Sequence, residues 1–136
     1  MADAHLDLHD ESALSGAVIG AAIEVHRYLG PGMLETVYQA CLERELVLRG
    51  IPFASSLRMP VRYKGMQVDA AYRLDLLVDE QVVVEIKSVE QLMPVHTSQV
   101  LTYLRLTGRQ LGLLINFNVP TLVKGVRRVV NGGSDR

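Results

Sequence analysis

The sequence predicts an α/β domain in which helices pack on the faces of a mixed β-sheet. Two helical stretches occupy residues 12–49, ahead of the main β-like segments. Residues 74–86 then form two short apolar runs around a polar Asp-Glu-Gln, the pattern of a β-hairpin. A further helical stretch at 95–107 and an almost wholly apolar run at 111–117 follow, and such a run is typical of a strand covered on both faces.

The first helix is expected from residue 12 to 29, with Ser12 as its N-cap and Gly30-Pro31-Gly32 as its end. A second helix is expected over 34–49, closed by Gly50. Residues 1–11 are acidic and lack a packing pattern, so we expect a leader there, a single domain over 12–131 and a tail over 132–136.

Residues 55–68 predict two β-like runs around a turn at Lys64-Gly65. Pro60 lacks an N–H donor, which makes the first run an edge strand or a bulged one. Basic residues alternate with apolar ones through this region. They could face a phosphate backbone, or they could simply keep a sheet edge from pairing; they are Arg58, Arg62, Lys64 and Arg73.

Three charged residues interrupt the apolar pattern of the central hairpin, namely Asp75, Glu85 and Lys87. An unpaired carboxylate in a buried strand costs several kcal/mol, so these groups need compensation. A three-residue loop at 79–81 places Asp75 opposite Glu85 on one sheet face, whereas a two-residue loop pairs Asp75 with Val84.

Two adjacent carboxylates and an ammonium have two interpretations. The carboxylates could hold Mg²⁺ or Mn²⁺, with Lys87 acting on a water molecule or a phosphate. Alternatively, the three groups could form a structural salt-bridge cluster in the sheet.

The helix at 95–107 has an apolar stripe of Val95, Val100, Leu101 and Leu104, while His96, Gln99 and Tyr103 share another face. A final strand is expected over 123–130.

Asp75, followed after an apolar strand by Glu85-Ile86-Lys87, resembles the core signature of the PD-(D/E)XK nuclease superfamily, with Leu74 where a proline often stands. GPGMLETVY at 30–38 resembles the motif of the GxxExxY family, carried here by Gly32, Glu35 and Tyr38. The resemblance extends from about Ser15 to Val130 through AAIEVHRYLG, VEIK, HTSQVLTYL and GLLINFN. QVLTY also resembles the glutamine-tyrosine helix of RecB-like members.

The resemblance implies a PD-(D/E)XK nuclease-like core and a divalent-metal-dependent nuclease acting on DNA or RNA. Asp75, Glu85 and the Ile86 carbonyl would hold Mg²⁺ or Mn²⁺, Lys87 would position the attacking water, and Glu35 would assist. The substrate groove would be shaped by Tyr38, His96, Gln99 and Tyr103. From its position alone, Glu35 could equally be a helix-stabilising acid in a first turn.

Composition limits the remaining options. The net charge is −1, and without the acidic leader 14 basic residues face 11 acidic ones, a weakly basic balance of +3 that argues against tight nonspecific DNA binding by a monomer. A lone cysteine, Cys41, and the lack of a signal or membrane-spanning pattern predict a cytoplasmic protein without membrane contact. The alternative function is a non-catalytic module of the same fold, as a homodimer or in a larger nucleic-acid-processing assembly. A small-molecule hydrolase is disfavoured because no aromatic pocket is evident.

Overall fold

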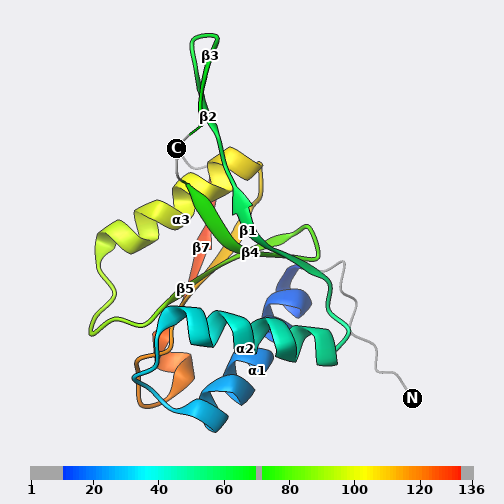
Figure 1. Ribbon diagram of the computed structural model, residues 1–136, viewed down its shortest axis with the longest axis vertical. Helices are drawn as coiled ribbons and strands as arrows, with labels where there is room; N and C mark the ends of the chain where they lie inside the picture. The colour runs from blue at the N-terminus through cyan, green and yellow to red at the C-terminus, as the bar shows by residue number, and fades with distance from the viewer. Residues whose placement is uncertain (1–10, 70–71, 133–136) are drawn as a thin grey trace.

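The computed structural model describes residues 11–69 and 72–132, so the expected leader and tail lie almost wholly outside the described part. Figure 1 shows three helices around a central sheet and a narrow two-stranded arm projecting from it. The elements in chain order are α1 (Glu11–Leu29), α2 (Glu35–Leu48), β1 (Phe53–Arg58), β2 (Val61–Tyr63), β3 (Met66–Val68), β4 (Arg73–Val78), β5 (Val82–Lys87), α3 (Pro94–Thr107), β6 (Leu111–Asn116), the 3₁₀ helix η1 (Leu122–Gly125) and β7 (Val126–Val130).

The main sheet has the strand order β1-β4-β5-β6-β7. β5 and β6 run parallel and the other neighbours run antiparallel, so the predicted mixed sheet is confirmed. The parallel pair requires a crossover connection, and α3 supplies it. The predicted α/β class follows from this order.

Helices cover both faces of the sheet, as the sequence predicts (Figure 1). α1 and α2 pack on one face against alternate residues of β5 such as Val82, Val84 and Ile86. α3 packs on the other face through Val100, Tyr103 and Leu104, and Val83 turns toward it. The alternation of strand side chains therefore divides the core into two clusters, one on each side of the sheet.

Four predicted details differ from the structure. β2 and β3 form a separate two-stranded sheet, because the chain leaves the main sheet after β1 at Pro60. The expected strand at 123–130 begins as η1 and becomes extended only at Val126. Val95, predicted to be in the apolar stripe of α3, is 66% exposed because it lies in the first turn, beyond the edge of the core. Glu11 is already helical, so α1 starts one residue before the expected domain boundary.

The segment after β6 packs tightly against the end of that strand. Asn116 is buried at the end of β6, and its side chain bonds both the N–H and the C=O of Val89 at 3.0 Å. Gly125 lies so near that an added Cβ would fall 2.1 Å from the Asn116 carbonyl oxygen. A side chain at position 125 would push η1 away from the end of β6.

We therefore expect Gly125→Ala to lower the free energy of unfolding by about 2 kcal/mol or more, because the clash is with backbone. Gly16→Ala is the matched control: it lies in α1 with nothing within 4 Å of the added Cβ, and alanine favours a helix by about 0.5–1 kcal/mol. Denaturant unfolding of both variants measures the difference. Equal stability of the two would contradict this account of the packing.

Candidate active site

β4 separates from β5 at Asp75. Of the two loop lengths that the sequence leaves open, the structure has the three-residue one, since Val78 pairs with Val82 across residues 79–81. The β4–β5 ladder continues only as far as Leu76 and Val84, one step short of the predicted pairing of Asp75 with Glu85. On the other side, the β1–β4 ladder skips Asp75 and the residue opposite it, Ser56. Ser56 has a φ of 53°, which is rare for a residue other than glycine.

The alternation of β4 side chains breaks at the same residue. Leu74 and Leu76 are two positions apart and should share a face, yet Leu74 joins the cluster under α3 and Leu76 joins the cluster under α1 and α2. Such a local irregularity re-aims a strand side chain, as bulges beside active sites do. Here it turns the Asp75 carboxylate into the opening between β4 and β5.

Side-chain hydrogen bonds replace the missing ladder bonds. The Ile86 N–H donates to Asp75 Oδ2 at 2.8 Å, and Gln39 Nε2 of α2 donates to the Asp75 carbonyl at 3.2 Å. The N–H and C=O of a strand residue point to the same side, so the Ile86 carbonyl also faces this opening. Its position agrees with the predicted ligand role, which stays a prediction.

Glu85 lies beside Asp75 on the α3 face of β5. Its residue is 4% exposed, and its Oε1 is buried without a hydrogen-bond partner in the described structure. Lys87, two positions along the strand, places its Nζ 3.6 Å from Glu85 Oε2. Glu85 and Lys87 thus share a side of the sheet, as the strand alternation predicts, and the irregularity of β4 brings Asp75 to them.

Burial strongly perturbs both carboxyl groups. Desolvation, followed by the charge of Asp75, raises the pKa of Glu85 to about 8, although Lys87 opposes the shift. Desolvation also raises the pKa of Asp75, against the hydrogen bond from Ile86. Both shifts favour a state in which the pair shares one proton near neutral pH, because two adjacent negative charges repel.

Glu35 approaches the site from the start of α2. Its Oε2 accepts a hydrogen bond from the Ser88 N–H at 3.1 Å, and its charge contributes to the raised pKa of Asp75. Ser88 Oγ in turn donates to the Met33 carbonyl at 2.7 Å. Glu35 thus ties the loop before α2 to the end of β5 and lies close enough to affect Asp75 electrostatically.

The structure corrects the role predicted for Tyr38. It was expected to line the substrate groove, but its ring is fully buried and stacks on Phe117 with centroids 4.4 Å apart. Its hydroxyl donates to the Gly30 carbonyl and accepts from the Met33 N–H. The hydroxyl bonds the loop at 30–34 and the ring packs in the core. Tyr38 therefore holds this loop in place.

A cleft of about 390 Å³ opens beside Glu85, lined also by Tyr72, Arg73, Gln99 and Tyr103. Gln99 Nε2 donates to the Tyr103 hydroxyl at 3.2 Å, so the predicted glutamine-tyrosine pair of α3 lies at the cleft. Burial, followed by the charges of Glu85 and Asp75, raises the pKa of Tyr103 to about 12. The phenol therefore stays protonated over the whole physiological range.

His96 does not line this cleft. Its Nδ1 accepts the Met93 N–H at 2.9 Å, which caps the first turn of α3. A histidine three residues after the N-cap satisfies a free N–H at the helix start, and this use explains its position better than substrate contact.

Sequence reasoning missed three supports of the site. Tyr72 forms a wall of the cleft, and Ser88 and Asn116 hold the segment after Lys87. The sequence does contain a signal for Asn116, because it is a polar residue at the end of an apolar strand. In the sheet, Asn116 pairs with Lys87. Tyr72 and Ser88 follow no periodic pattern, and only the folded chain brings them to the site.

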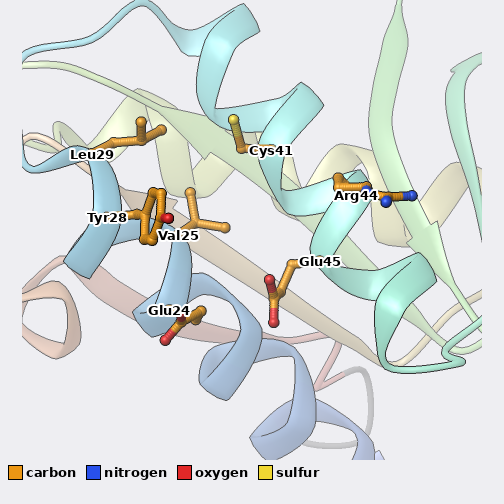
Figure 2. Close-up of a pocket in the computed structure, with 7 residues that line it drawn as sticks. All are labelled: Glu24, Val25, Tyr28, Leu29, Cys41, Arg44 and Glu45. Atoms are coloured by element: carbon orange, nitrogen blue, oxygen red, sulfur yellow. The ribbon is translucent and has the colours of Figure 1, made fainter.

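A second hollow, of about 200 Å³, lies between α1 and α2 on the opposite face of the sheet (Figure 2). Its walls include Tyr28, Arg44 and Cys41, and Cys41 also packs against the core. The acidic pair of the hairpin does not reach it.

The residues at the opening between β4 and β5, beside the first cleft, fit a divalent cation. Two carboxyl groups and a backbone carbonyl offer oxygen ligands, and Glu85 Oε1 is a buried oxygen without a partner. In residues 11–69 and 72–132, no three His, Cys, Asp or Glu side chains gather as a ready ligand set. One or two carboxylates suffice for Mg²⁺, which keeps several of its waters.

Comparison with known families now places the chain. A model of the PD-(D/E)XK nuclease superfamily matches residues 12–129, which is nearly the whole sequence. The chain belongs to this superfamily, whose members generally use divalent metals in cutting nucleic acids. A comparison with curated proteins finds no match. Across the described residues, no helix has the length and apolar character needed to cross a membrane.

The raised pKa of Glu85 predicts a pH-dependent stability. Folding favours the protonated acid, so this contribution is complete below about pH 4.5 and is lost as the pH rises through about 8. We expect the metal-free protein to lose on the order of 3 kcal/mol of unfolding free energy between about pH 5 and pH 9 through this group. Glu85→Gln, which resembles the protonated acid, should lose much less. If the unfolding free energies of the two proteins, measured in a chelator, fall in parallel as the pH rises, the assignment of this effect to Glu85 is wrong.

Proposed function

We propose that this protein hydrolyses phosphodiester bonds of DNA or RNA with Mg²⁺ or Mn²⁺. The observation that carries the proposal is the convergence of Asp75 and Glu85 beside an open cleft, with one buried carboxylate oxygen left unpartnered. Lys87 lies 3.6 Å from the other oxygen of Glu85, Oε2, so the ion pair leaves Oε1 available to a cation. Belonging to a nuclease superfamily supports the same conclusion.

Each residue has a role that follows from its position. Asp75, Glu85 and the Ile86 carbonyl would hold the cation, which when bound would activate water and offset phosphate charge. Lys87 Nζ, beside Glu85, orients the attacking water and stabilises charge developing on the phosphate. Glu35 holds the end of β5 and adds negative potential near Asp75. Gln99 and Tyr103 contact the substrate from α3.

The chain further fits the GxxExxY branch of the superfamily. In this reading the motif residues have a shared mechanical purpose, because Gly32 (φ 97°), Glu35 and Tyr38 together shape the loop at 30–34 and attach it to Ser88. The motif thereby braces the strand that carries Glu85 and Lys87.

A non-catalytic module of the same fold, acting as a homodimer or within a larger assembly, is the second candidate. It is favoured by the net charge of −1 and by the lack of a third clustered ligand within the described residues. Calorimetric titration with Mn²⁺ separates the two functions, since the second predicts no binding even at millimolar metal.

The catalytic proposal predicts that Asp75→Asn and Lys87→Met each reduce Mn²⁺-dependent cleavage of DNA or RNA by at least about 100-fold, because each removes a charge used in the reaction. Asp79→Asn is the matched control, the same change in the loop of the same hairpin. Single-stranded, double-stranded and branched substrates would be assayed, with circular dichroism as the test of folding. Full activity of Asp75→Asn would refute the proposal.

Metal affinity should rise with pH. The cation displaces the proton held by Glu85, so Mn²⁺ affinity should increase by up to about tenfold per pH unit below about 8 and level off above it. Calorimetry in buffers of different ionisation enthalpy would also count the released proton. An affinity independent of pH over this range would show that Glu85 does not bind the metal.

A further inference from the structure

The β2–β3 hairpin stands apart from the rest of the molecule. Figure 1 shows this arm, residues 61–68, projecting past the end of the main sheet. Its strands pair only with each other in the described structure, through Val61–Val68, Arg62–Gln67 and Tyr63–Met66. A lone two-stranded hairpin is marginally stable in water, so a ligand that covers it would add stability.

One face of the arm is apolar and exposed. Directly paired residues share a face, so Tyr63 and Met66 lie together with Val61 and Val68. Tyr63 is 57% exposed and Met66 is 55% exposed. Lys64 lies 5.3 Å above the Tyr63 ring, which adds a cation to the aromatic surface. The arm thus offers a flat apolar surface edged by positive charge.

The base of the arm joins the wall of the active-site cleft. Met59, just before the arm, is buried in the same cluster as Tyr103, and its N–H donates to the Tyr72 carbonyl at 3.0 Å. The Tyr72 ring meets the Tyr103 ring edge to face, with centroids 6.3 Å apart. Both tyrosines line the cleft beside Glu85. A ligand on the arm is therefore directed toward the acidic pair.

Positive charge concentrates along this path. Residues 58–73 hold four basic residues and one acidic residue, a balance of +3, whereas the remaining chain has 10 basic and 14 acidic residues, a balance of −4. Arg58 and Arg73 are paired directly across β1 and β4, and both are exposed. Like charges in that position repel, and neither has an ion-pair partner in the described structure. A phosphate between the two guanidinium groups would remove the repulsion.

We infer that the arm and the Arg58–Arg73 pair bind single-stranded nucleic acid and lead it into the cleft. Bases stack on Tyr63 and the apolar face, while the arginines bind the backbone. The inference rests on the proposed nuclease function and specifies its substrate. Duplex exteriors present phosphates and groove edges, which match an apolar face poorly, whereas unpaired bases expose the apolar surfaces that the arm requires.

Binding can be tested without cleavage. Fluorescence anisotropy in a chelator would use the full chain, a labelled 15-nucleotide oligo(dT), and a duplex of equal length. We expect tighter binding of the single strand, weakened about fivefold or more in a Tyr63→Ser, Met66→Ser double variant. Tyr28→Ser is the matched control, since Tyr28 is 86% exposed on α1, and its affinity should be unchanged. Arg58→Gln, which removes one of the two proposed backbone contacts, should reduce the salt dependence of binding by about one released ion.

The possible outcomes separate this inference from the proposed function. Loss of single-strand binding in the arm variant supports the inference even if the protein cleaves nothing. Unchanged binding by the arm variant overturns it even if cleavage is seen, and so does undetectable binding by the unmodified chain. Equal or tighter duplex binding overturns the single-strand assignment. A dimer that the arm substitutions convert to a monomer, measured by sedimentation without DNA, would identify the arm as a subunit contact and likewise overturn it.

Discussion

The site depends on one hydrogen bond, from the Ile86 N–H to the Asp75 carboxylate. Strands β4 and β5 are regularly paired near their loop and then part, and at the parting a side chain takes the place of a backbone acceptor. This bond satisfies an N–H that the separated strand no longer pairs, and it fixes the direction of Asp75. Without the separation, the acids would sit in a closed sheet with no room for a ligand.

The same arrangement is costly for stability. Burial raises the pKa values of Asp75 and Glu85 because charged carboxyl groups lose water there, and Lys87 offsets only part of this cost. Surrounding elements hold the geometry against that cost. Glu35 fastens the loop before α2 to Ser88, and Asn116 fastens Val89 to the end of β6. Supports of this kind explain why functional acids can remain buried, close together and incompletely paired.

The molecule is also electrostatically divided. Glu85 of the acidic pair lines a cleft together with Arg73, and the segment 58–73, which includes the arm, has a balance of +3. A net charge near zero conceals this division, because the +3 of residues 58–73 is offset by the −4 of the remaining chain. An argument from overall charge alone therefore underestimates the capacity of this one surface to attract a polyanion.

Periodicity in the sequence determined most of the fold, because helix and strand patterns record which faces are buried. It predicted the α/β class, the central hairpin and the shared face of Glu85 and Lys87, while the length of the hairpin loop stayed open. Periodicity gave wrong predictions where contacts between distant segments determine the structure. Tyr38 has a core role because Phe117 lies against its ring, and the arm leaves the sheet because β4, not β2, takes the place beside β1. The sequence alone placed two acids in one hairpin, whereas only the tertiary structure opened the strands between them, since that opening depends on α2, α3 and β1 together.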